Sequence, residues 1–220
     1  MLFISLLIVK INFLYYFYIM ILIDKVRTAT YDLHQSLDHS LVPYLETIKS
    51  KEQYADLLQL FYGFFRPVYD KIDVNLELQY LPDYLNRRKP EWILNDLQDL
   101  EVNYTIQLCE HLPEIKNNAA AFGALYVLEG STLGGVVIRK MLYDQLHIDK
   151  GLTFFSGYGK QTREYWNVFI NSLNNLDNHS NAEEIVIQTA AATFKSFKEW
   201  LQYSGQAERT LKHRNTPAAY

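Results

Sequence analysis

Along most of the chain, apolar residues recur every three or four positions, which is the spacing of an amphipathic helix. This spacing predicts helices over residues 24–39, 51–72, 91–110, 119–146, 162–173 and 182–203. Residues 76–89, 151–159 and 171–181 have the composition of connections, and 204–220 that of a frayed tail. No stretch alternates as a β-strand does, and no segment repeats. We therefore expect an all-α fold, with about seven or eight helices in a single domain over residues 24–203.

Local signals refine the ends of these helices. Val42-Pro43 should end the first helix, because the residue before proline is pushed out of the helical region. Ser50 followed by Gln53 is a capping signal for the second helix, and Pro67 predicts a kink inside it. Pro90 suits the first turn of the helix that follows it.

The N-terminal segment 1–23 is almost wholly apolar and reaches the roughly 20 residues that a membrane span needs, although Lys10 interrupts it. No small-residue cleavage site follows it, which argues against a removable secretory signal. Met20 is a plausible true start. The segment is therefore an over-called start, a membrane anchor or a further helix, and we expect a cytoplasmic protein with N-terminal anchoring as the alternative.

Composition narrows the class of protein. Cys109 is the single cysteine, which excludes an internal disulfide and a cysteine-rich metal site and suits a reducing compartment. The net charge is −4 and no basic run is present, so nothing indicates binding to nucleic acid. With 17 tyrosines and 12 phenylalanines, the chain suits an aromatic interior or pocket.

Glycines interrupt the helix predicted over residues 119–146, and each costs about 1 kcal/mol relative to alanine. Gly123, Gly130 and Gly134 lie near one face and strip it of side chains, so something flat or bulky should press on that backbone. Taken alone, the Gly130–Gly134 spacing favours close packing of another helix. Glu129 is costly in this apolar setting unless it is paired, which predicts a buried hydrogen bond or salt bridge.

The helix over residues 24–39 carries a polar stripe. His34 lies one turn after Thr30 and one turn before Asp38, with Arg27 two turns earlier on nearly the same face. The stripe supplies an imidazole, a carboxylate that can orient it, and a cation about 10 Å away along the axis. Haem iron and haem propionates require such groups, but a lone helical histidine is more often an ordinary core or surface residue.

Read together, the two helices resemble those of a known family. Residues 26–38 resemble the proximal helix of haem (heme) oxygenases, and 129–135, Glu-Gly-Ser-Thr-Leu-Gly-Gly, resemble their distal helix, especially in bacterial-type members. Phe154-Phe155, Tyr158-Gly159 and Trp166 are similar to a pattern in the bacterial branch. The resemblance covers about residues 24–203, with the motifs in the right order.

The resemblance implies haem b held between the two helices, with His34 as the axial ligand of the iron. The segment of Gly130, Ser131, Gly134 and Gly135 would lie against the other side of the macrocycle and serve catalysis, because bare backbone approaches where a Cβ could not. The implied cofactor-binding residues are Arg27, Thr30, His34, Thr132, Lys160, Arg163 and Phe194. Arg27 matches a basic residue near one propionate, and Lys160 or Arg163 is a candidate for the other. Ordinary core packing is an equal alternative for Phe194.

The activity implied is O2-dependent cleavage of haem, as substrate and cofactor, to biliverdin, CO and Fe2+. Electrons would come from a ferredoxin, flavodoxin or reductase, with no tightly bound flavin, and biliverdin could pass to a bacteriophytochrome. One departure concerns Ser131, since animal-type members place an aspartate there, and a hydroxyl orders water without supplying a negative charge.

Two alternatives to the enzyme remain open. The first is a non-enzymatic haem-binding or haem-sensing protein on the same fold, which the Ser131 departure leaves room for. The second is a membrane-tethered helical interaction protein whose glycine face receives a partner helix.

Overall fold

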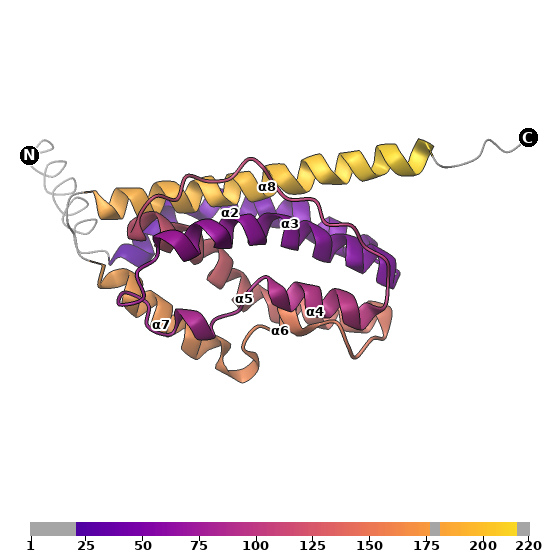
Figure 1. Ribbon diagram of the computed structural model, residues 1–220, viewed down its shortest axis with the longest axis horizontal. Coiled ribbons are helices and arrows are strands. Elements are labelled where there is room, and N and C mark those ends of the chain that lie inside the picture. Colours follow the sequence, from indigo (N-terminus) through magenta and orange to yellow (C-terminus); the bar gives the residue numbers. More distant parts are fainter. Residues whose placement is uncertain (1–20, 177–180, 215–220) are drawn as a thin grey trace, which may run out of the picture.

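The computed structural model describes residues 21–176 and 181–214, with side chains as far as Tyr203. Within these ranges the chain is helical and contains no strand, which confirms the all-α prediction (Figure 1). The helices are α2 (Leu22–Thr47), α3 (Lys51–Asn75), α4 (Glu91–Leu100), α5 (Asn118–Leu146), α6 (Thr153–Ser156), α7 (Thr162–Asn174) and α8 (Ala182–Arg214), with short 3-10 turns η1 (Tyr84–Asn86) and η2 (Gly159–Gln161). Residues 1–20 lie outside the described ranges, so the readings of that segment stay predictions.

Helix α5 is the centre of the molecule, in contact with α3, α6, α7 and α8, while α2 packs mainly on α8. Its first half is buried nearly all round, as expected of a helix enclosed by others. At Gly123 a Cβ would lie 2.5 Å from the carbonyl oxygen of Val186 on α8. The absence of a side chain there therefore serves close packing of two helices.

Among the described residues, α5 is also the helix that is long and apolar enough to cross a membrane. However, 56% of its apolar window is buried inside the protein. Core packing therefore accounts for this composition.

Three helix ends differ from the predictions. Helix α2 continues through Pro43 to Thr47, because buried Leu45 and Ile48 hold its end against the core. Helix α4 ends at Leu100, where Glu101 takes a left-handed conformation with φ 58°. Helix α8 extends past residue 203 to Arg214, beyond the other helices (Figure 1).

The residues predicted to extend α4 form instead an irregular connection, 101–117, that crosses α3. The Cys109 amide donates to the carbonyl of Gly63, 2.8 Å away. A Cβ on Gly63 would overlap the carbonyl of Gln107, so the crossing depends on that glycine. Tertiary contacts have thus outweighed a continuing helical pattern.

Other local signals hold. The Ser50 hydroxyl accepts from the Gln53 amide at 3.3 Å, and the Gln53 side chain accepts from the Lys49 amide at 2.6 Å. This is the predicted capping box, with the return bond one residue earlier than usual. Pro90 stands at the N-cap position, one residue before the first turn of α4 where it was expected. Helix α3 runs through Pro67 without ending there, and the predicted kink stays a prediction.

A cluster of aromatic rings fixes α6 against the long helices. Rings from α3, α6 and α8 meet mostly edge to face, at centroid distances of 4.8–6.5 Å. The cluster comprises Phe61, Phe64, Phe65, Phe154, Phe155 and Phe197. The cluster holds the short helix α6 in a position where it also contacts α5.

Candidate functional site

His34 lies on an exposed face of α2, with 58% of its side chain accessible. Its Nε2 is 3.6 Å from Oδ2 of Asp38, one turn further along the helix. This distance is too long for a hydrogen bond, so the carboxylate lies beside one ring nitrogen without fixing it. The predicted imidazole and carboxylate therefore lie side by side at the protein surface, where a large ligand could reach them.

The other two residues of the stripe differ in exposure. Arg27 is exposed and pairs with Asp24 at 2.9 Å, so its guanidinium can reach an outside anion. Thr30 is buried and donates to the carbonyl of Val26 at 2.8 Å, and it also faces the Tyr126 hydroxyl. Burial raises the pKa of that phenol. Thr30 thus links α2 to α5 and does not project outward with Arg27.

A row of rings runs from His34 to the glycine helix. The His34 ring lies 5.4 Å from the Phe194 ring, Phe194 lies 6.4 Å from Tyr126, and Tyr126 lies 5.9 Å from Trp166. The Trp166 ring is 3.6 Å from the point that a Cβ on Gly130 would occupy. Helices α2, α8, α5 and α7 each supply one ring, and the row connects the two predicted halves of the site.

The glycines of α5 face two ways. Outside the backbone of its own helix, a Cβ on Gly134 would meet no atom of the described residues within 4 Å, and one on Gly130 would meet the Trp166 ring. A Cβ on Gly135 would instead lie 2.6 Å from the carbonyl oxygen of Phe155 on α6. The expectation that Gly123, Gly130 and Gly134 bare one face, and that Gly135 joins them, is therefore corrected. Gly134 is open, Gly130 lies against the Trp166 ring, Gly123 packs on α8 and Gly135 admits α6.

The open side of this helix is apolar. Leu133, Val136 and Val137, next to Gly134 in sequence, are 43%, 50% and 67% exposed. At 100° per residue Val137 shares the face of Gly134 and Leu133 borders it, whereas Val136 points to the other side of the helix. The exposed aliphatic side chains of Leu133 and Val137 beside Gly134 suit a flat apolar ring.

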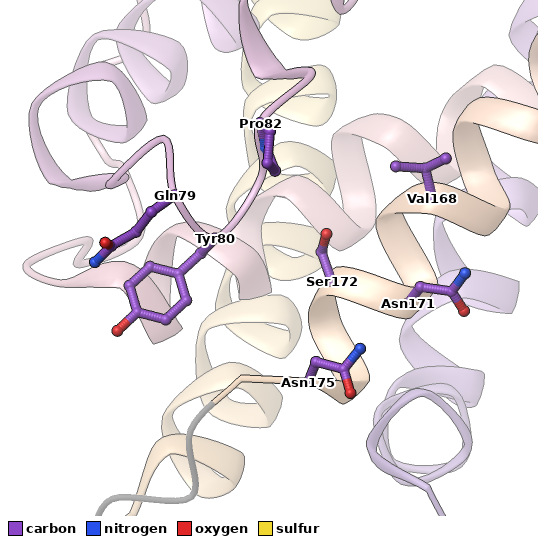
Figure 2. Close-up of a pocket in the computed structure, with 7 residues that line it drawn as sticks. All are labelled: Gln79, Tyr80, Pro82, Val168, Asn171, Ser172 and Asn175. Carbon is purple, nitrogen blue, oxygen red and sulfur yellow. The ribbon is translucent and has the colours of Figure 1, made fainter.

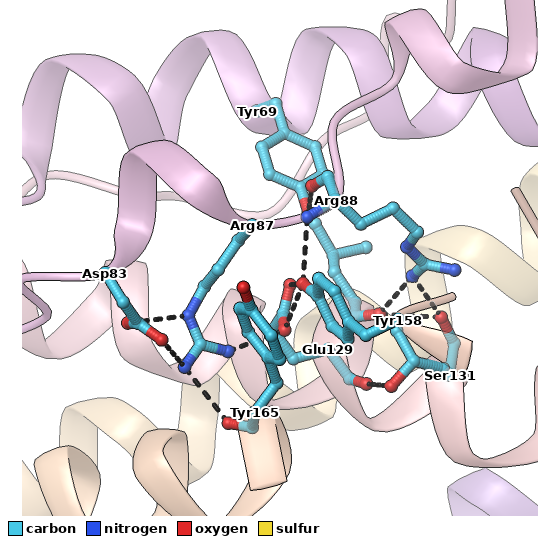
Figure 3. Close-up of polar contacts among 10 residues, drawn as sticks. Tyr69, Asp83, Arg87, Arg88, Glu129, Ser131, Tyr158 and Tyr165 are labelled. Carbon is cyan, nitrogen blue, oxygen red and sulfur yellow. Dashed lines mark hydrogen bonds and ion pairs between the residues drawn. The ribbon is translucent and has the colours of Figure 1, made fainter. Parts of the chain in front are cut away.

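The Ser131 hydroxyl is held on both sides (Figure 3). It donates to the carbonyl of Leu128 at 2.6 Å and accepts from Nη2 of Arg88 at 2.7 Å. Since its only hydrogen is engaged, it can accept from a further group but cannot donate to one. Arg88 is 1% exposed, with no carboxylate within ion-pair distance in the described ranges and its Nε unpaired.

Glu129 is buried and paired, as predicted (Figure 3). Its carboxylate accepts from Nη1 of Arg87 at 2.7 Å and from the Tyr158 hydroxyl at 2.9 Å. Arg87 also pairs with Asp83 at 2.8 Å. Burial and the Glu129 carboxylate raise the pKa of Tyr158, so this phenol remains the donor.

The buried arginines of this network were not expected. Arg87 and Arg88 stand in a polar connection, where basic residues are usually solvated. The available signal was indirect: a buried glutamate on α5 requires a cation, and two arginines precede the helix at Pro90.

The remaining predicted residues fall in two settings. Thr132 is buried and donates to the carbonyl of Glu129 at 2.7 Å, which keeps its hydroxyl within the helix. Lys160 and Arg163 are exposed and lie near the start of α7, the helix that carries Trp166. Either could supply a cation to an anionic group at that end.

Two surface hollows lie away from these residues. One, of about 330 Å³, separates the connection before η1 from α7 (Figure 2). Its lining consists of Gln79, Tyr80, Pro82, Val168, Asn171, Ser172 and Asn175. The other, of about 540 Å³, lies at the start of α5. Neither contains His34 or the glycine segment, and the described residues include no cluster of three or more metal-ligating side chains.

Haem fits the residues present. An exposed imidazole with a carboxylate behind it suits iron, and the bare direction at Gly134 admits a flat ring. The exposed guanidinium of Arg27 suits a propionate. The fold and the site thus define a helical protein that presents a histidine and a glycine-bearing helix to a flat, anionic, largely apolar ligand.

Comparison with protein families identifies the class. The family model described as Heme oxygenase matches residues 20–203, and the chain belongs to this family. A comparison with curated proteins finds no match.

Solved bacterial structures share the fold. The haem oxygenase of Leptospira interrogans has a TM-score of 0.67 at 17% identity, covering 84% of this chain and 100% of the other. The Neisseria meningitidis haem oxygenase, solved with NO and CO bound, has 0.65 at 25% identity, with coverages of 84% and 92%. Heme oxygenase-1 of Synechocystis sp. PCC6803, solved with heme, has 0.63 at 16% identity, with coverages of 89% and 99%.

Proposed function

We propose that this protein binds haem and cleaves it with O2 and reducing equivalents to biliverdin, CO and Fe2+. The observation that carries the proposal is the row of rings that joins His34, on one helix, to the bare glycine face of another. Family membership supports the same reaction. Bound haem would supply the oxygen-activating and redox chemistry. The protein would orient the haem and exclude water from it.

On the proximal side, His34 would bind iron as a neutral imidazole. Asp38 lies beside the ring and would fix its orientation through the other nitrogen. Arg27 would pair with one propionate, and Lys160 or Arg163 with the other. These contacts would set the rotation of the macrocycle, and with it the ring position exposed to oxidation.

On the distal side, Gly130 and Gly134 would let backbone come close to the ring plane. Close backbone leaves little height above the plane, so a diatomic ligand there would be directed along it. Ser131 would accept a hydrogen bond from an ordered water, and the row of rings would exclude other water.

The axial assignment is tested by titrating the apoprotein with hemin and recording absorption spectra. The His34→Ala variant should lose the wild-type ligation spectrum. His39→Ala is the matched control, since His39 is exposed on the same helix and lies outside the site, and it should keep that spectrum. An unchanged spectrum in His34→Ala would contradict the assignment.

Turnover is a separate test. The hemin complex, reduced in air by a ferredoxin with its reductase, should lose its Soret band and yield biliverdin and CO. A flavodoxin is the alternative donor, and a bacteriophytochrome is a candidate acceptor of the product.

The second candidate function is haem binding without cleavage. It is favoured by the Ser131 hydroxyl, whose hydrogen is already engaged by Leu128. Recovery of ferric haem with no biliverdin would support it over the enzyme.

A further inference from the structure

Asp96 is a buried carboxylate that the proposed reaction does not use. It lies on α4 with no accessible surface. Its two oxygens accept from the amides of Thr153 and Phe154, at 2.8 and 2.7 Å. These are the first two amides of α6, which no bond within the helix can satisfy, and Leu152 provides no side-chain cap. Asp96 therefore caps α6 from a different helix.

Helix α6 in turn touches the glycine segment at two points. The carbonyl of Phe155 lies so close to Gly135 that a Cβ there would be only 2.6 Å from its oxygen. The carbonyl of Phe154 accepts from Nη1 of Arg88 at 3.4 Å, and Nη2 of the same guanidinium holds Ser131. The backbone of α6 thus packs against the glycine segment, residues 130–135, both directly and through Arg88.

The glycine segment has few contacts on its open side near Gly134. Outside the backbone of its own helix, no atom of the described residues lies within 4 Å of a Cβ position there. The contacts from α6 and Arg88 on the opposite side therefore help to hold this part of α5, together with the packing of the helix on α3, α7 and α8.

We propose that Asp96 is a positioning residue for the haem reaction, because by capping α6 it fixes the height of the Gly130–Gly135 backbone above the haem. The part that concerns haem rests on the proposed function, whereas the mechanical link from Asp96 to the glycine segment does not.

The chemistry of the cap supports this role. A buried carboxylate is costly, and Asp96 makes no ion pair in the described ranges to offset that cost. Burial accordingly raises the pKa of Asp96, while the bonds to the two amides act in the opposite direction. A serine or asparagine at position 152 would cap α6 without burying a charge. The long-range cap does what a local one cannot, since it ties α6 to α4.

The link is tested without haem by hydrogen–deuterium exchange on the apoprotein. The Asp96→Asn variant should exchange the amides of residues 130–135 faster than wild type. Asp99→Asn is the matched control, since Asp99 lies on the same helix with an exposed side chain, and it should exchange as wild type does. Unchanged exchange in Asp96→Asn would overturn the proposal.

The consequence for the site is tested with carbon monoxide on the reduced hemin complex, followed by infrared spectroscopy. Asp96→Asn should retain hemin binding through His34, but its C–O stretching band should shift and broaden. A purely structural role would lower the melting temperature and leave that band unchanged, which would also overturn the proposal.

Folding and function are separated by two further checks. If Asp96→Asn does not fold, Phe155→Leu decides the question, because it loosens α6 while leaving the carboxylate intact, and the same two changes are expected. A wild type that does not bind hemin contradicts the proposed function. If wild type binds hemin, but the variant shows unchanged amide exchange and an unchanged C–O band, this inference is contradicted and the proposed function is not.

Discussion

At the scale of single residues, Gly134 and Gly135 are adjacent but serve different ends. Gly135 admits the backbone of α6, whereas no contact among the described residues requires Gly134 to lack a side chain. A helix interior is a poor place for glycine, and the proposed haem would account for the cost at Gly134. Sequence spacing alone could not separate them, because the difference depends on where α6 packs.

This contrast predicts opposite effects of alanine. Gly135→Ala should destabilise the apoprotein by about 1–3 kcal/mol, since the added methyl group overlaps α6. Gly134→Ala should leave apoprotein stability unchanged or raise it by up to about 1 kcal/mol, and should weaken hemin binding. Urea unfolding and hemin titration of both variants measure this. Unimpaired hemin binding by Gly134→Ala would contradict the site.

Asp96 predicts a pH dependence of stability. Burial raises its pKa in the folded state above the ordinary value of 3.8. The folded state therefore holds more protons than the unfolded state between the two pKa values, and stability falls as pH rises through that window. Relative to Asp96→Asn, wild type should lose unfolding free energy from about pH 4 upward.

Urea unfolding across pH 4–7 checks the sign, with Asp144→Asn, which removes an exposed carboxylate on α5, as control. If the unfolding free energy of wild type instead rises with pH relative to that of Asp96→Asn, the two amides outweigh burial and lower the pKa of Asp96.

At the scale of elements, periodicity and caps identified the helices, and tertiary contacts decided several of their ends. The stripe of Arg27, His34 and Asp38 followed from helical spacing alone. The expectation that Glu129 is paired followed from the cost of an unpaired charge in an apolar setting. The identity of its partner did not, because residues 76–90 carry no periodic signal that places Arg87 over α5.

The ion pair between Arg87 and Glu129 joins this connection to α5, and its loss should be costly. Glu129→Leu leaves Arg87 buried beside Asp83 alone and should lower the free energy of unfolding by about 3 kcal/mol. The double variant Arg87→Met, Glu129→Leu should recover part of that loss.

The exposed pair of Lys140 and Asp144, also on α5, provides the control. Asp144→Asn should cost less than about 1 kcal/mol in the same urea unfolding. A loss at Glu129 no larger than this would show that the buried pair contributes little.

At the scale of the whole molecule, α8 joins the two halves of the candidate site. It packs along both α2 and α5, and its Phe194 lies between the rings of His34 and Tyr126. The family match begins at residue 20, and α2 begins at Leu22 with Ile23 already in the core.

This arrangement predicts that a chain begun at Met20 folds and binds hemin as the full chain does. Circular dichroism and hemin titration of both forms test it. Weaker binding by the shorter chain would show that residues 1–19 contribute to the domain.

The row of rings has a further, practical consequence. Trp166 lies at the end of the row opposite His34, beside Gly130. A strongly absorbing molecule bound along that row would accept excitation energy from the indole of Trp166. Binding of haem should therefore quench the tryptophan fluorescence of the protein. The Trp166→Phe variant gives the fluorescence of Trp92 and Trp200 alone. The difference between wild type and this variant should therefore report how much of the protein has bound haem.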